Sequence, residues 1–387
     1  MAARPVIRVK PREGKRARLG APWLFSNEIE MTKELAPGSV VNVLGDDGQP
    51  FGTGFFNPKS LIAVRLVDRA LDVAVDETFF VAKFARAQAV REALFAAPYY
   101  RLAHAEGDGL PGLTIDRFAD VLTVQITTAG MEAAKEMILG ALKKVVAPTK
   151  IILRADASSR SLEGLESYVE AEGGGRIGIE ENGVRYIADA GAGQKTGWYY
   201  DQRENRAFMA RLAKGRSVLD AYSYVGGFAL AAAKAGAKSV TGLESSAPAV
   251  ALAEEAAAAA HLSARFLKAD VFEDLERFAA AKESFDIVIG DPPPFVKSKK
   301  DLEAGAKAYR KLARLAAQVT APGGFLFLAS CSHNIAVDRL AFECAAGIAR
   351  GGRTARLIHQ AGAGPDHPVH PMLPESAYLK ALVYALD

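Results

Sequence analysis

The sequence predicts a doubly wound, Rossmann-like α/β sheet in its C-terminal half, preceded by a small β domain and a central α+β domain. From residue 217 onwards, apolar strands alternate strictly with helical stretches. Such alternation implies βαβ units and a parallel sheet. Near the N-terminus, short apolar runs are separated by Pro-Gly, Asp-Gly and Asn-Pro pairs, which predict tight turns between strands. We expect domains over residues 1–72, 73–188 and 189–387.

The composition is that of a folded chain with more than one core. The chain has 387 residues, of which 50% are hydrophobic, enough for two or three domains. Two cysteines are too few for a disulfide framework and indicate a reducing, cytoplasmic location. Their spacing predicts no metal site. We expect no secretory leader and no membrane contact, because the N-terminus lacks an apolar segment and no run of about 18 apolar residues occurs. The net charge of +3 permits an acidic partner.

The elements expected in the first two domains are short. Strands are expected at residues 40–44 and 61–66 of the β domain. In the central domain we expect helices at 79–95 and 131–145, and strands at 113–116, 121–127, 151–154 and 184–188.

The C-terminal domain is expected to contain five parallel strands and one antiparallel pair. The parallel strands are expected at residues 217–222, 239–243, 265–268, 285–290 and 325–329. The last two runs, 354–359 and 377–385, are expected to pair as an antiparallel hairpin at the sheet edge.

Acidic residues end the first three strands of this sheet. Asp220 ends the first, and Gly226 and Gly227 then open a helix whose N-terminus offers free N–H groups. Glu244 ends the second strand, where a carboxylate accepts ribose hydroxyls, and Asp270 ends the third, where a carboxylate can meet an adenine amino group. Each feature alone is common on surfaces, but together they predict a nucleoside-binding crevice. The absence of G-x-G-x-x-G and of a P-loop sequence argues against NAD and ATP.

A stiff loop, Asp291-Pro292-Pro293-Pro294-Phe295, follows the fourth strand. Prolines fix φ and lack N–H donors. Prolines often simply end a strand, but an acid beside an aromatic ring is suited to hold a planar base by its edge and face.

The fifth strand ends in Ser330-Cys331-Ser332-His333. Most free cysteines are inert core residues, which describes Cys344 in its apolar helical run. Cys331 differs, because it lies at the same sheet edge as Asp291, where a helix N-terminus and His333 favour a thiolate. Its position alone leaves a catalytic and a structural role open.

Three polar or basic segments each have two interpretations. The polar and aromatic stretch 193–205 is either a linker or a segment that lays Lys195 over a cofactor. The basic run after the proline loop, and a second one with seven Lys/Arg between residues 4 and 18, are either solvated surfaces or phosphate-binding surfaces.

In combination, these motifs resemble the large-subunit ribosomal RNA cytosine-5 methyltransferases that carry an N-terminal PUA domain. The resemblance covers essentially the whole chain. Residues 21–28 look like the opening motif of the PUA domain, 108–117 like the signature of the central domain, and 366–368 with 374–380 like the tail motif. Ala21 stands where a histidine is more usual, and Pro294 where a lysine is often found.

The resemblance implies a class I methyltransferase sheet, S-adenosylmethionine as cofactor and ribosomal RNA as partner. It implies Cys331 as nucleophile and Asp291 as the acid that faces the cytosine. The residues implied or expected at the cofactor are Lys195, Thr196, Tyr199, Asp201, Arg203, Asp220, Tyr222, Ser223, Gly226, Gly227, Phe228, Glu244, Asp270 and Asp291. Those expected at the RNA are Pro292, Pro293, Phe295, Lys297, Lys299 and Lys300.

Two other functions remain open at this point. Related sheets with Asp-Pro-Pro methylate guanine in RNA without a cysteine on the next strand, so Cys331 argues against guanine. A non-catalytic RNA-binding module is the other, and the intact set of acids argues against it. The sequence is also compatible with a homodimer.

Overall fold

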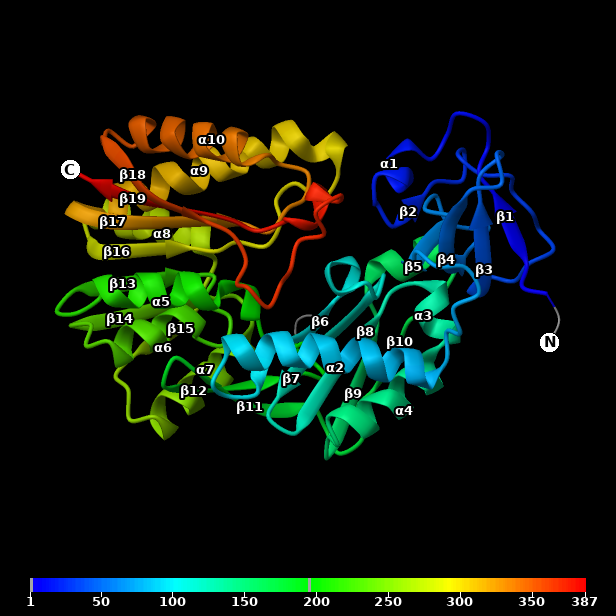
Figure 1. The fold of residues 1–387 in the computed structure, drawn as a ribbon. Helices are drawn as coiled ribbons and strands as arrows, with labels where there is room; N and C mark the ends of the chain where they lie inside the picture. Colours follow the sequence, from blue (N-terminus) through cyan, green and yellow to red (C-terminus); the bar gives the residue numbers. More distant parts are fainter. Residues whose placement is uncertain (1–2, 194–195) are drawn as a thin grey trace. The chain divides into compact units, whose positions relative to one another are not determined.

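The computed structural model describes residues 3–193 and 196–387. The chain divides into two compact units, each built from separate segments (Figure 1). The first comprises residues 1–177, 189–198 and 365–376, and the second comprises 178–188, 199–364 and 377–387. Within the described ranges, no helix is long and apolar enough to cross a membrane.

The N-terminal part of the first unit is a five-stranded sheet with a short helix, α1 (Lys15–Arg18). The predicted strand at 61–66 begins only at Val64, because Leu61 lies in the preceding turn and is 78% exposed. The strands, in sheet order, are β1 (Val6–Arg8), β3 (Ser39–Leu44), β4 (Pro50–Phe56), β5 (Val64–Asp68) and β2 (Trp23–Leu24).

A second five-stranded sheet lies beside helices α2 (Glu77–Leu94) and α4 (Lys135–Val145), which pack on each other. The predicted helix at 131–145 is interrupted at Ala134, whose backbone leaves the helical region, so α3 (Ala129–Ala133) precedes α4. The strands, in sheet order, are β10 (Tyr168–Glu170), β9 (Lys150–Ala155), β8 (Val121–Ile126), β7 (Leu113–Phe118) and β6 (Tyr99–His104). Short 3-10 turns are η1 (Ala105–Asp108), η2 (Ser158–Glu163) and η5 (Pro374–Ser376).

The second unit is built on the predicted α/β sheet, which has seven strands. Five strands run parallel, and β19 lies antiparallel between β17 and β18, so the predicted C-terminal hairpin forms at the sheet edge. In sheet order the strands are β15 (Arg265–Lys268), β14 (Ser239–Glu244), β13 (Ser217–Ala221), β16 (Phe285–Gly290), β17 (Thr320–Ser330), β19 (Lys380–Leu386) and β18 (Ala355–Ala361). A separate pair, β11 (Arg176–Glu181) and β12 (Val184–Asp189), crosses the division between the units.

Helices cover both faces of the seven-stranded sheet (Figure 1). On one face α8 packs on α9 and α9 on α10, and on the other α5 packs on α6. The helices are α5 (Arg203–Leu212), α6 (Gly227–Lys234), α7 (Ala247–Ala259), α8 (Val271–Ala280), α9 (Leu302–Val319) and α10 (Val337–Arg350), with 3-10 turns η3 (Tyr200–Gln202) and η4 (Lys299–Asp301).

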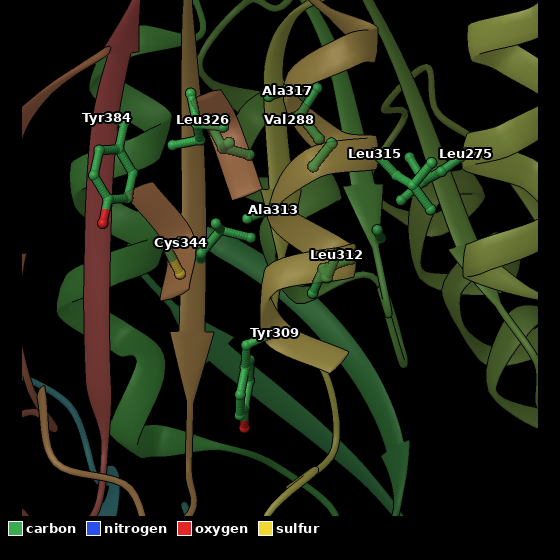
Figure 2. Close-up of a cluster of buried hydrophobic side chains, with 14 of the residues drawn as sticks. Leu275, Val288, Tyr309, Leu312, Ala313, Leu315, Ala317, Leu326, Cys344 and Tyr384 are labelled. Carbon is green, nitrogen blue, oxygen red and sulfur yellow. The ribbon is translucent and has the colours of Figure 1, made fainter. Parts of the chain in front are cut away.

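The core of the second unit includes Leu312, Leu326 and Cys344 among apolar neighbours (Figure 2). Burial raises the pKa of the Cys344 thiol well above its ordinary value, so this cysteine stays a neutral thiol, as its apolar helical pattern predicts.

The order of the strands identifies where a ligand would bind. From β13 the chain adds β14 and β15 on one side, and then β16 and β17 on the other. In open α/β sheets, ligands bind beyond the carboxyl ends of the strands at such a reversal. The loops that follow β13 and β16 therefore flank the expected crevice.

Candidate functional site

Near its end, β13 carries a buried carboxyl group of which one oxygen has a hydrogen-bond partner and the other has none among the described residues. Asp220 is 1% exposed, and its Oδ2 accepts a hydrogen bond from the backbone N–H of Ala229 at 2.8 Å in the first turn of α6. Its Oδ1 has no hydrogen-bond partner among the described residues. Burial, with the nearby charge of Asp291, raises the pKa of Asp220 to about 8. A buried carboxyl oxygen without a hydrogen-bond partner indicates a place for a ligand.

The backbone of the loop after β13 is strained. Tyr222 and Tyr224 have φ angles of 67° and 50°, a region that is unfavourable for residues with a bulky side chain. Gly226, at φ 82°, precedes α6, and a Cβ there would lie 2.9 Å from the Phe266 ring. Ser223 is buried, and its Oγ has no partner within the part of the chain that the structure describes. Backbone strain beside open polar atoms is typical of ligand sites.

Glu244, at the end of β14, holds this loop in place. Its Oε2 accepts from the N–H of Tyr224 at 3.0 Å, and its Oε1 accepts from the N–H of Ser246 at 2.7 Å and from Ser245 Oγ at 3.2 Å. A carboxylate can accept roughly four hydrogen bonds. Glu244 therefore retains capacity for a ligand hydroxyl while it supports the loop.

Asp270 does not end a strand, in contrast to the prediction. Strand β15 ends at Lys268, and Asp270 is the N-cap of α8. One of its oxygens, Oδ1, accepts from the N–H groups of Phe272 and Glu273 at 2.9 and 3.1 Å. The cap explains the acid at this position, because a helix start needs an acceptor for its free N–H groups. Its predicted contact with the adenine stays a prediction.

The predicted cofactor residues of segment 193–205 are distributed over both units. Lys195 lies outside the described residues, and Thr196 belongs to the first unit. In the second unit, the ring of Tyr199 meets that of Tyr224 edge-on at 5.5 Å, and burial raises the pKa of Tyr199 well above its ordinary value. The Oδ2 of Asp201 accepts from the Tyr378 hydroxyl at 2.5 Å.

An ion pair that the sequence did not predict anchors this segment. Arg206 on α5 donates to Glu181 Oε1 and Oε2 at 2.6 and 2.9 Å, and to the carbonyl oxygen of Tyr199 at 2.8 Å. Arg203, a predicted cofactor residue, lies with its Nε 3.6 Å from Glu181 Oε2. Glu181 comes from β11, and no local sequence pattern links it to α5. The pair of strands β11 and β12 also contacts the start of α6, because the Tyr186 hydroxyl donates to the carbonyl of Gly227 at 3.3 Å.

Tyr309 on α9 links the loop after β16 to the end of β17. Its ring centroid lies 4.8 Å from that of Phe295, and its hydroxyl lies 2.7 Å from Ser330 Oγ. Burial raises the pKa of Tyr309 to about 12, and the charges of Cys331 and Asp291 contribute in the same direction. The charges of Asp291 and Cys331 also raise the pKa of Tyr199. The structure thus brings Asp291 and Cys331 into one neighbourhood, and the half-buried Cys331 contrasts with the fully buried Cys344.

The basic run after the proline loop divides into two parts. The side chains of Lys297, Lys299 and Lys300 are exposed. Further along, Arg310 pairs with Glu343 at 2.6 Å, and Lys311 with Glu276 at 3.1 Å. The first part is therefore available for an acidic partner, whereas these two residues of α9 serve the protein's own ion pairs. Among the described residues, no cluster of His, Cys, Asp or Glu is suited to bind a metal.

Comparison with known proteins agrees with this arrangement. Residues 7–69 match the family model of PUA-like domains, and residues 154–385 match that of S-adenosylmethionine-dependent methyltransferases. The chain is 38% identical to ribosomal RNA large subunit methyltransferase I of Pseudoalteromonas atlantica over 94% of each chain. It is 36% identical to the protein of the same name from Shewanella amazonensis, over 97% of this chain and 98% of the other.

Two solved structures share the fold over nearly the whole length. A candidate SAM-dependent methyltransferase from Streptococcus mutans has a TM-score of 0.82 at 23% identity and covers 98% of this chain and 100% of its own. A candidate methyltransferase in complex with SAH gives a TM-score of 0.84 at 23% identity, with the same coverage.

Proposed function

We propose that this chain, which belongs to the ribosomal RNA large subunit methyltransferase I family of S-adenosylmethionine-dependent methyltransferases, methylates C5 of a cytosine in large-subunit ribosomal RNA through a covalent bond to Cys331. The observation that carries the proposal is that the half-buried Cys331 and Asp291 both lie close enough to Tyr199 and Tyr309 for their charges to raise the pKa of these tyrosines. A carboxylate and a thiol in one neighbourhood are the two groups that C5 chemistry on a pyrimidine needs.

The residues of the first βα loop fit the cofactor of this family. S-adenosylmethionine, when bound, supplies the methyl group and presents hydroxyl and amino donors. Asp220 Oδ1 and Ser223 Oγ are buried without partners in the described part of the chain, and Glu244 has accepting capacity left. These three side chains would hold the donor at the reversal of the sheet.

Cys331 would convert the cytosine into a nucleophile. C5 of cytosine is unreactive by itself, whereas attack of the thiolate Sγ on C6 forms an S–C6 bond and moves the electrons of the C5–C6 double bond towards C5. C5 would then form a bond to the methyl group of S-adenosylmethionine as the bond from that methyl group to the sulfonium sulfur breaks, leaving S-adenosylhomocysteine. When a base removes the C5 proton, the double bond re-forms and the S–C6 bond breaks, which restores the thiolate. This path divides one hard step into two easier ones.

Asp291 and its loop would hold the base during these steps. A carboxyl group near N3 and the exocyclic amine stabilises the charge that develops when sulfur attacks C6. Phe295 and Pro293 would offer apolar surface to a base that has left its stack, which offsets the loss of stacking. Pro292, which was also expected at the RNA, is buried and can act only by stiffening the loop. Lys297, Lys299 and Lys300 would contact RNA phosphates.

An RNA that cannot complete the reaction tests the proposal. Large-subunit RNA with 5-fluorocytosine at the target lacks the C5 proton, so the adduct should persist in the presence of S-adenosylmethionine. We expect a slower band on a denaturing gel, and peptide mapping should locate the adduct on Cys331. An adduct on Cys344, or no adduct with an RNA whose unmodified form is methylated, would contradict the proposal and favour guanine methylation.

A further inference from the structure

A lysine with no role in the steps above lies beside the proposed nucleophile. Lys380 begins β19 and pairs in the sheet with Ser330, the residue before Cys331. Its Nζ donates hydrogen bonds to the carbonyl oxygen of Ser332 at 2.7 Å and to that of Tyr378 at 2.9 Å. The half-buried ammonium group is therefore attached to the turn that carries Cys331, immediately after the cysteine itself.

We propose that Lys380 is a positioning residue that fixes the Cys331 turn and holds this cysteine as a thiolate by its adjacent positive charge. The inference rests on the covalent mechanism proposed above and adds the group that activates its nucleophile. A neighbouring lysine or arginine is one of the established means by which proteins stabilise thiolates. The two carbonyl acceptors favour the charged form of the lysine, because a neutral amine is a weaker donor.

The other titratable groups around Cys331 create the need for such a cation. The charge of Asp291 raises the pKa of the same two tyrosines as the charge of Cys331 does. A negative charge at Asp291 therefore disfavours ionisation of the Cys331 thiol. Burial raises the pKa of Tyr199 and Tyr309, so their hydroxyls are neutral at neutral pH. His333 lies two residues beyond Cys331, with its ring 5.4 Å from that of Tyr378.

The electrostatics of Lys380 itself agree with this geometry. Burial lowers the pKa of the Lys380 ammonium, while the charge of Cys331 acts to raise it. By reciprocity, a thiolate that stabilises the ammonium is stabilised by it to the same extent.

The experiment measures how readily Cys331 ionises, without RNA and without methyl transfer. The full chain with Cys344→Ala is alkylated with iodoacetamide over a range of pH, and the midpoint of the rate profile reports Cys331. Lys380→Gln keeps N–H donors for the two carbonyls but removes the charge, and Lys380→Arg keeps the charge. Lys238→Gln is the matched control. Lys238 is exposed and directly precedes β14, so it lies at the amino-terminal ends of the parallel strands, whereas Cys331 follows the carboxyl-terminal end of β17. Calorimetry with S-adenosylmethionine identifies folded variants.

The parent midpoint should lie below the ordinary thiol value of about 8.5. Lys380→Gln should raise it by about one pH unit, so that alkylation at pH 7 slows about tenfold. Lys380→Arg and Lys238→Gln should stay close to the parent. An unchanged midpoint in Lys380→Gln, or an equal shift in Lys238→Gln, would overturn the inference. If Lys380→Gln does not fold, a parent midpoint at or above the ordinary value would overturn it as well.

The inference and the proposed function can fail separately. Full methyl transfer by Cys331→Ala would refute the covalent mechanism but leave the thiol titration as it is. An unshifted thiol in Lys380→Gln, with the 5-fluorocytosine adduct still on Cys331, would remove Lys380 from the mechanism and retain the nucleophile.

Discussion

The amino-terminal and the carboxyl-terminal ends of the parallel strands, called here the amino edge and the carboxyl edge of the seven-stranded sheet, give a carboxylate opposite environments. At the amino edge, Asp286 Oδ2 accepts from the N–H of Ser217 at 2.7 Å and from its hydroxyl at 2.8 Å, and these bonds keep the pKa of Asp286 below its ordinary value. At the carboxyl edge, burial raises the pKa of Asp220 to about 8, and its Oδ1 has no partner in the described ranges.

This difference separates residues that build the fold from residues that the fold supports. Asp286 and Ser217 join β16 to β13 at their starts, and the hydrogen-bonded carboxylate there stabilises the sheet. Asp220 also lies on β13, only three residues after Ser217. Its burial leaves Oδ1 without a hydrogen-bond partner among the described residues, which costs free energy of folding. We infer that the carboxyl edge is organised for a ligand. The following predictions would sharpen or break this contrast.

The largest effect should come from the cysteine at the carboxyl edge. Cys331→Ala should lower the single-turnover rate of methyl transfer by more than about a thousandfold, the scale of removing a nucleophile. Its affinity for S-adenosylmethionine should be unchanged, because Cys331 is not among the acceptors of the first βα loop.

Cys344→Ala is the matched control for that variant. It should keep full activity and lose about 1 kcal/mol of unfolding free energy, since it removes a buried sulfur from the core. Single-turnover assays and urea denaturation measure the two quantities. Comparable losses of activity in both variants would mean that position at the sheet edge does not distinguish the cysteines.

The second prediction concerns the pH dependence of stability. Asp220 has a folded pKa of about 8 and an ordinary value of 3.8, so between these values the native state holds a proton that the unfolded state releases. The free energy of unfolding should therefore fall as pH rises, by about 1.4 kcal/mol per pH unit from this group. Asp220→Asn should remove that slope, as urea denaturation from pH 5 to pH 8 would show.

Asp286 should behave in the opposite sense. Its pKa is lowered in the folded state, so its stabilisation is complete above its ordinary value of 3.8 and is lost as pH falls through the folded pKa. Asp286→Asn should be less stable than the parent at pH 7 and approach it in acid. Parallel pH profiles of the parent and Asp220→Asn would contradict the contrast between the edges.

A third, smaller effect is expected at Glu244. Glu244→Ala should weaken S-adenosylmethionine binding by about 1–3 kcal/mol, the scale for leaving polar partners unmet. Calorimetry measures this, with Glu283→Ala as control, because Glu283 is exposed and precedes β16 at the amino edge. Unchanged affinity in a folded Glu244→Ala variant would remove Glu244 from the donor site.

Local patterns in the sequence predicted the sheet and the acids along its carboxyl edge, because strand alternation and strand ends are local properties. The expected range 265–268 matches β15, but the interpretation of Asp270 as the acid that ends this strand was wrong, because Asp270 caps the following helix, α8. Strand β6 was missed, because Tyr-Tyr-Arg-Leu-Ala-His lacks strict alternation.

Local patterns could not predict contacts between segments that lie far apart in the sequence. Glu181 meets Arg206 only because β11 crosses into the second unit. Lys380 reaches the Cys331 turn only because β19 pairs with β17 in one register. A single-residue slip of that register would turn the lysine to the other face of the sheet, and nothing in the spacing of the motifs encodes it.

The smallest effect should separate the basic residues of the two edges. Lys299→Glu with Lys300→Glu changes exposed lysines that follow the proline loop, so RNA affinity should depend less on salt. The slope of log affinity against log salt should flatten by about 1.4, because each phosphate contact with single-stranded RNA contributes about 0.7. Lys234→Glu with Lys238→Glu carries the same charge change at the amino edge, on exposed residues at the end of α6 and before β14, and should leave the slope as it is. Filter binding over a salt series measures both slopes, and calorimetry should show unchanged affinity for S-adenosylmethionine in both double variants. Equal flattening in the two would mean that the RNA responds to net charge and not to the carboxyl edge, whereas an unaltered slope in the first would assign Lys299 and Lys300 to a solvated surface.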